Sequence, residues 1–145
     1  EEGFHILTLC LQNSLGNTSD DPLRGLQEIG VAYVKFAIAH PAHYRVMFGA
    51  LRADSQSYPS LSAAGQEAFT VMINIIEIGQ NVGKINPGES QHLAWVTWSL
   101  VHGLAMLLLE GQLPIADEGD VISLAKLATQ SLICGIKHQE KTKCF

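Results

Sequence analysis

An almost unbroken apolar run from Leu93 to Leu109 restricts the possible folds of this chain more than any other feature. A membrane-spanning helix needs about 20 such residues. This run is shorter, lacks basic flanks and contains a histidine, His102, near its middle. A helix that is apolar on every side can also be the central helix of a soluble oligomer. We therefore interpret the run as a helix buried between subunits, and we expect no membrane partner.

The composition of the whole chain supports this interpretation. Hydrophobic residues make up 47% of the 145 residues and charged residues only 16%, against roughly 25% charged residues in typical soluble domains. A single copy would have to expose apolar surface, and a second copy is the usual way to cover it. The composition therefore predicts a homodimer.

Hydrophobic periodicity predicts an all-α fold in a single domain, residues 1–145. Apolar residues recur at helical spacing, whereas alternating runs and Asn-Gly or Asp-Gly turns are missing. Six helices are expected: residues 2–15, 22–40, 42–48 and 59–82, a fifth from a capping box at Asn86 and Glu89 to about Gly111, and 118–137. Asp21 is expected to cap the second helix, and acidic residues 117, 118 and 120 suit the start of the last. A polar loop is expected at 53–57.

The charge distribution argues against DNA binding by this chain alone. The formal net charge is -5, and basic residues cluster only in the tail from Lys137 to Lys143, which also contains Glu140. Binding to duplex DNA draws much of its affinity from cationic side chains on phosphates. We therefore expect the chain to be a poor DNA binder.

The cysteines and the first residues bear on the compartment. Cys10, Cys134 and Cys144 are odd in number and form no Cys-x-x-Cys pair, which favours a reducing cytoplasm over a disulfide framework. The start, Glu1 to Gly3, is neither basic nor apolar and does not resemble a signal peptide. Because it also lacks a methionine, we expect it to be a cut end inside a helix.

Two segments resemble the C-terminal domains of TetR-family transcription regulators. Residues 33–49 contain Tyr33, Phe36 and Ala37, followed by Pro41, Tyr44, Met47 and Phe48, in a pattern similar to Tyr-x-x-Phe-Ala and Pro-x-x-Tyr-x-x-Met-Phe of those domains. Residues 98–104 are similar to the Trp-x-x-x-His-Gly signature of one subgroup, with Trp98, His102 and Gly103 in place. The resemblance covers nearly the whole chain.

The resemblance implies a division of labour within a longer regulator, here taken as a repressor. A helix-turn-helix domain, absent from this chain, would bind operator DNA, and residues 2–15 would be the end of the helix that joins the two domains. The earlier helices would enclose a pocket for a small effector, and the two C-terminal helices would pair with their copies as a four-helix dimer interface. The effector would act by binding one arrangement of the dimer more tightly than the other.

The dimer interface is expected to draw on large and small residues of the last two helices. These are Leu104, Leu107, Leu108, Val121, Leu124, Ala128, Leu132 and Gly135. The alternative is that the same residues form only the core of one copy. Two consecutive apolar helices with small residues between them favour pairing.

The candidate ligand-binding residues are mostly aromatic or sulfur-containing. They are Phe36, Tyr44, Met47, Phe48, Phe69, Met72, Ile76, Trp95, Trp98, Ser99 and His102. The same residue types at helical spacing can equally form plain core. If they form a pocket, its ligand should be apolar or aromatic, oriented by His102, Tyr44 or Ser99. For His102 itself we favour a neutral core histidine bonded to a neighbouring helix.

Two other classes of protein fit the sequence less well. Glu89 and His92 have the Glu-x-x-His spacing of di-iron helical bundles, but such a site needs two of these motifs and there is no second one. No nucleophile elbow is present. We therefore expect no catalysis, metal or cofactor, and keep a metal-dependent helical-bundle enzyme and a ligand-free dimeric adaptor as alternatives.

Overall fold

The computed structural model describes residues 1–16, 18, 20–49 and 58–139, and these form an all-α fold without strands. The six helices are α1 (Glu2–Leu15), α2 (Pro22–Ala39), α3 (Pro41–Phe48), α4 (Pro59–Asn81), α5 (Ser90–Leu109) and α6 (Glu118–Ile136). This confirms the expected fold class. The predicted loop at 53–57, Lys141, Lys143 and Cys144 lie outside the described residues.

The predicted cap at Asp21 is present, and one of the acidic residues expected at the start of the last helix, Asp117, is a second cap. The Asp21 carboxylate accepts a hydrogen bond from the backbone N–H of Arg24 at 3.2 Å, with Pro22 as the first helical residue. The Asp117 carboxylate accepts from the N–H groups of Gly119 and Asp120 at 2.8 and 3.3 Å. Each carboxylate satisfies helix N–H groups that have no partner within the helix.

The predicted capping box at Asn86 and Glu89 is wrong. Glu89 is itself the N-cap residue of α5, and no side chain caps that helix. The N–H of Asn86 instead donates to the carbonyl of Ile136 at 3.0 Å, beside an isolated bridge between Ile85 and Lys137. Because the turn after α4 is tied to the end of α6, Asn86 is held away from the start of α5.

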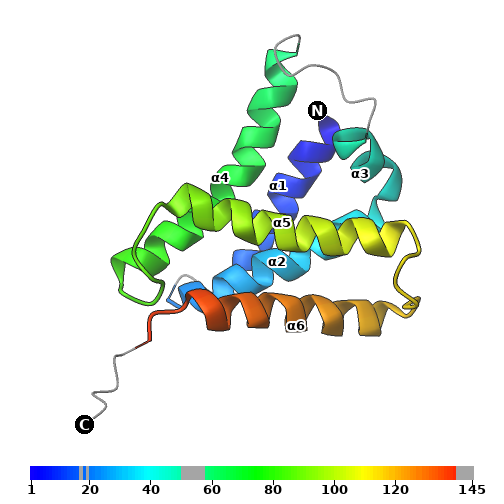
Figure 1. Cartoon of the computed structure of the whole chain (residues 1–145). Coiled ribbons are helices and arrows are strands. Elements are labelled where there is room, and N and C mark those ends of the chain that lie inside the picture. Colours follow the sequence, from blue (N-terminus) through cyan, green and yellow to red (C-terminus); the bar gives the residue numbers. More distant parts are fainter. Residues whose placement is uncertain (17, 19, 50–57, 140–145) are drawn as a thin grey trace.

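Helix α2 is the central element, and it packs against all five other helices. In Figure 1, α5 and α6 lie side by side in opposite directions, and α2 lies behind both. The three helices approach closely at Gly30, where a Cβ would collide with Thr129 of α6 and lie 3.4 Å from Val101 of α5. Only glycine allows this spacing without displacing a neighbour.

Helix α5 is only narrowly buried within one copy. Its buried residues are the small ones on a single stripe, Ala94, Thr97, Val101 and Ala105. Among the described residues α5 is the one helix long and apolar enough to cross a membrane by length and composition, yet only 22% of its most apolar stretch is buried. One copy therefore leaves most of its most apolar helix partly or fully uncovered.

Candidate functional site

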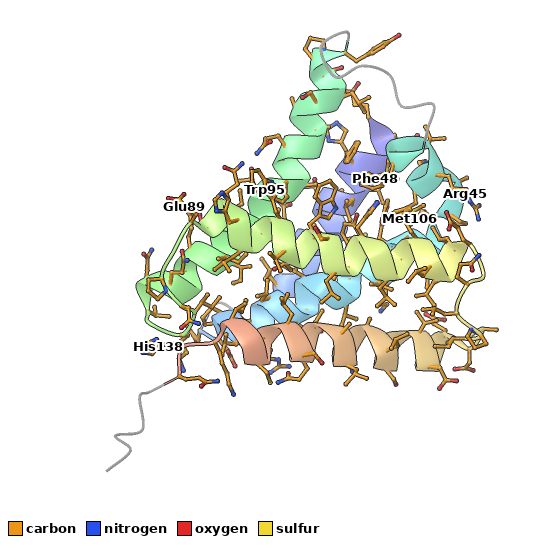
Figure 2. The ribbon with its side chains drawn as sticks, in the orientation of Figure 1. Arg45, Phe48, Glu89, Trp95, Met106 and His138 are labelled. Atoms are coloured by element: carbon orange, nitrogen blue, oxygen red, sulfur yellow. The ribbon has the colours of Figure 1, made fainter. Side chains whose placement is uncertain are left out.

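A cavity of about 340 Å³ lies between α1, α4 and α5, with one wall residue each from α2 and α3. Its lining comprises Phe4, Leu7, Leu11, Tyr33, Phe48, Ser62, Gly65, Gln66, Ala68, Phe69, Met72, Gln91, Trp95 and Trp98. Figure 2 shows Phe48 of α3 and Trp95 of α5 on the same side of α5. Five elements of the fold therefore converge on one hollow.

The cavity is apolar inside and polar at its edge. The side chains from α1 and Met72 of α4 are buried, and none of the lining residues carries a charge. The polar lining residues Ser62, Gln66 and Gln91 are exposed. This arrangement suits a ligand with an apolar or aromatic body and a polar end near solvent.

The predicted ligand-binding residues divide into three groups in the structure. Phe48, Phe69, Met72, Trp95 and Trp98 line the cavity. Tyr44 and His102 lie behind its wall and reach it through hydrogen bonds to Tyr33. Four predicted residues do not line it, namely Phe36, Met47, Ile76 and Ser99.

Each of those four residues has another position. Ile76 is fully buried in the core, and Met47 packs against Gly3 of α1. Phe36 faces a different hollow, between α1, α2 and the start of α6. Ser99 is exposed, and its hydroxyl donates to the carbonyl of Trp95 at 2.7 Å. None of the four is part of the wall of this cavity.

A chain of hydrogen bonds runs from the cavity wall into the interior. The indole N–H of Trp98 donates to the Tyr33 hydroxyl at 3.0 Å. The Tyr33 and Tyr44 hydroxyl oxygens are 3.0 Å apart, and the Tyr44 hydroxyl lies 2.6 Å from Nδ1 of His102. Helices α2, α3 and α5 are thereby joined through their side chains.

The available protons give this chain a direction. If Nδ1 of His102 is the unprotonated acceptor, Tyr44 donates to it, Tyr33 donates to Tyr44 and Trp98 donates to Tyr33, so every donor has an acceptor. If Nδ1 carries a proton instead, it donates to one of the two tyrosines and that tyrosine donates to the other. The hydroxyl proton of the second tyrosine then has no acceptor among these side chains. The geometry therefore assigns the proton of neutral His102 to Nε2.

Burial favours the uncharged form of the three titratable groups joined by these hydrogen bonds, His102, Tyr33 and Tyr44. It lowers the pKa of His102 from its ordinary 6.5. It raises the pKa of Tyr33 to about 12, against smaller opposing effects of its hydrogen bonds with Tyr44 and Trp98. It also raises the pKa of Tyr44, with Tyr33 adding to the increase. The half-buried His102 is thus a neutral histidine bonded to neighbouring helices, as favoured from the sequence, and it borders the cavity through the lining residues Tyr33, Phe48 and Trp98.

All the predicted dimer residues lie on the neighbouring helices α5 and α6, and all but one of them are at least partly exposed. Leu104, Leu108, Leu124, Ala128 and Leu132 are half-buried, whereas Leu107 and Gly135 are exposed. Val121 instead lies in the core of one copy, because the start of α6 turns it toward α2. Two residues not predicted, Val96 of α5 and Leu127 of α6, are more exposed than Leu107, at 52%, 63% and 44%.

Comparison with known proteins identifies the family. Residues 26–131 match the family described as tetracyclin repressor-like, C-terminal domain. The chain belongs to this family. The TetR-like domain is also similar to a solved structure described as a protein with unknown function from Rhodococcus sp. RHA1. The TM-score is 0.83 and the identity 26%, over 94% of this chain and 70% of that chain. Comparison with curated proteins gives no match.

The family assignment has a general functional meaning. TetR-like C-terminal domains typically sense ligands and form dimers, and they are typically not enzymes. Within the described part of this TetR-like domain, no three His, Cys, Asp or Glu side chains lie together as a metal site would require. Glu89 is exposed at the start of α5, and His92 stacks on Trp95 with ring centroids 5.3 Å apart.

Sequence reasoning missed part of the cavity of the TetR-like domain. Phe4, Leu7 and Leu11 lie in the helix predicted at residues 2–15 but were not selected as a cavity wall, since the sequence does not show what that helix faces. Gln91 had a usable signal, because it precedes Trp95 by four residues and Trp98 by seven, which places all three on one helix face. Tyr33 was part of the family pattern but was not selected.

Proposed function

We propose that this chain is the effector-sensing and dimerisation domain of a TetR-like transcriptional repressor, and that a small apolar or aromatic molecule occupies the cavity. The supporting observation is the uncharged cavity of about 340 Å³, whose walls include Phe4, Phe48, Phe69 and both tryptophans. Ligand pockets generally have volumes of about 300–1,000 Å³ and mostly apolar linings. The exposed amides of Gln66 and Gln91 would hydrogen-bond a polar end of the ligand at the mouth.

The same proposal assigns the uncovered faces of α5 and α6 to a second copy. The exposed apolar side chains Val96, Leu107 and Leu127 lie on these two adjacent helices. Helices of 20 and 19 residues are about 30 Å long and pack about 10 Å apart. Their common face therefore covers roughly 600 Å² in each copy. Two such faces together reach the roughly 1,200 Å² at which stable interfaces begin.

In the full regulator, effector binding would be coupled to operator DNA through this dimer. Helix α5 contributes Trp95 and Trp98 to the cavity and Val96 and Leu107 to the exposed face. An effector that fits one position of α5 better than another would shift the dimer toward one arrangement. The DNA itself would be bound by a helix-turn-helix domain outside this chain, in the cytoplasm.

A thermal-shift screen with small hydrophobic and aromatic compounds tests the cavity as the effector site. A compound present at about a hundred times its Kd should stabilise the fold by about 2.7 kcal/mol. Gly65 provides a matched pair of variants, because a Cβ there would lie 3.6 Å from Phe4, an ordinary contact. Gly65→Leu should fill the cavity and abolish the shift, whereas Gly65→Ala should preserve most of it. A hit that stabilises Gly65→Leu as strongly as the wild type would place the ligand elsewhere.

A further inference from the structure

Trp95 belongs to the cavity and to the uncovered face of α5 at the same time. It lines the cavity, yet 46% of the residue is exposed, which places it with the exposed large apolar residues of the described part. The ring of His92 stacks on it at an interplanar angle of 27°. The indole is therefore held at the mouth, where the cavity meets the outer surface.

The register of α5 places this residue at a boundary. Gln91, Trp95 and Trp98 follow one another on the face that lines the cavity. Val96, the next residue after Trp95, is 52% exposed and begins the apolar outer face that continues to Leu107. Adjacent helical residues point about 100° apart, so the apolar outer face begins about a quarter turn from the cavity side of α5, and Trp95 is the lining residue nearest to it.

Among the described residues of one copy, the cavity stays open on that side. Its rim residues Ser62, Gln66 and Gln91 are exposed, in contrast to the buried side chains on its floor. An apolar ligand in the cavity would keep part of its surface in water, where it gains nothing from burial. The ligand site is therefore incomplete in a single copy.

We infer that a second copy of this chain closes the mouth of the cavity, with Trp95 buried jointly by the cavity and the partner. This rests on the proposed function, because the occupant of the α5 and α6 face is the second copy of the dimer. The apolar face that needs covering is continuous with the mouth. A subunit seated on Val96 and Leu107 therefore also covers Trp95. Ligand binding and dimerisation then strengthen each other by the same factor.

The two tryptophans of the chain, Trp95 and Trp98, make the inference directly measurable. Trp98→Phe leaves Trp95 as the one fluorescent indole, and Trp95→Phe leaves Trp98. Adding Leu107→Glu places a charge on the outer face and should separate the copies. Ile78→Glu on α4 is the matched control, since Leu107 and Ile78 are each 44% exposed.

Acrylamide quenching of Trp95 should be at least about twofold weaker in the dimeric Trp98→Phe protein than in Trp98→Phe/Leu107→Glu, and Ile78→Glu should have no such effect. Trp98 should change less, because it is already half-buried. Equal quenching of Trp95 in proteins that sediment as dimer and monomer would overturn the closure of the mouth and leave the dimer intact. A wild-type protein that sediments as a monomer would overturn both.

A second measurement avoids any change to the tryptophans. Nile red, a neutral hydrophobic dye, should bind the Leu107→Glu protein at least about fivefold more weakly than the Ile78→Glu protein, as coupled sites do. Loss of dye binding in Gly65→Leu, which fills the cavity, would show that the dye binds there. Equal affinity in the two charged variants, with the dye excluded by Gly65→Leu, would contradict closure by the partner.

Discussion

The indole N–H of Trp98 and the hydroxyl of Tyr33, 3.0 Å apart, join the cavity wall to the interior of the bundle. Through Tyr33 the bond continues to Tyr44 and to His102. Trp98 and His102 are one turn apart on α5. The row of hydrogen bonds between them therefore leaves this helix, passes through α2 and α3 and returns to it. The position of α5 against the cavity is thereby fixed by directional bonds as well as by packing.

The hydrogen bonds from Trp98 to His102 predict unequal effects for two tyrosine-to-phenylalanine changes. Tyr33→Phe leaves the Trp98 N–H without its acceptor and should cost roughly 1–3 kcal/mol of unfolding free energy. Tyr44→Phe should cost about 1 kcal/mol or less, because the Tyr33 hydroxyl lies 3.0 Å from Nδ1 of His102 and can donate in its place. Urea unfolding of both variants measures the difference. A larger loss for Tyr44→Phe would show that Tyr33 does not replace Tyr44 as the partner of His102.

The burial of His102 predicts that stability falls on mild acidification. Because burial lowers its pKa below 6.5, the unfolded chain binds more protons than the folded one, and stability increases with pH in this range. The contribution of His102 to the stability is complete above pH 6.5 and is lost as the pH falls through its lowered pKa in the folded protein. His102→Asn keeps an acceptor near Nδ1 but does not titrate. Unfolding should therefore show a greater wild-type advantage at about pH 7.5 than at about pH 5.5, and a constant advantage would refute this role of His102.

The buried tyrosines predict a delayed ionisation in alkali. Tyr58→Phe leaves Tyr33 and Tyr44 as the two remaining tyrosines. Burial raises the pKa of Tyr33 from 10.0 to about 12 and that of Tyr44 as well, so stability is complete below 10.0 and is lost as the pH rises toward about 12. Absorbance titration of the folded variant should show no tyrosinate near pH 10.0, whereas the urea-unfolded variant should ionise there. Ionisation of the folded variant near pH 10.0 would show that the hydroxyls of Tyr33 and Tyr44 are not buried.

Two helical glycines should respond oppositely to alanine. At Gly30 a Cβ would collide with Thr129, so Gly30→Ala should lower stability by about 1–3 kcal/mol through overpacking. At Gly65 the nearest atoms to a Cβ are ordinary contacts with Phe4. Gly65→Ala should therefore raise stability by up to about 1 kcal/mol through helix propensity. Thermal unfolding of the pair tests whether α2 and α6 approach as closely as described, and a stabilised Gly30→Ala protein would show that they do not.

Sequence reasoning succeeded where the cause is local. Asp21 caps α2 through a bond to a residue three positions away, and Asp117 lies at the start of α6 as its charge predicts, so the local pattern alone was sufficient to place both. Asn86 had the same local signal, but its N–H bonds to Ile136, fifty residues further along the chain. A long-range contact of this kind overrides a local preference and leaves no mark in the neighbouring residues.

The cavity could be predicted only in part for a related reason. The spacing of Trp95, Trp98 and His102 placed them on one face of a helix, but not on which side of the hydrogen-bond chain each would lie. Phe36 was an equally good aromatic candidate, and it faces another hollow because α2 presents different sides to α1, α5 and α6. The direction in which a central helix faces depends on the packing of all its neighbours.

Sedimentation of the wild type, Leu107→Glu and Ile78→Glu at micromolar concentration tests the central claim, that a second copy covers α5 and α6. The wild type and Ile78→Glu should sediment as dimers, with twice the chain mass of 15.7 kDa. Leu107 is as exposed as Ile78 but lies on α5, and Leu107→Glu should sediment as a monomer of 15.7 kDa. Wild-type protein that stays at 15.7 kDa, or a dimer that Leu107→Glu leaves intact, would contradict the account.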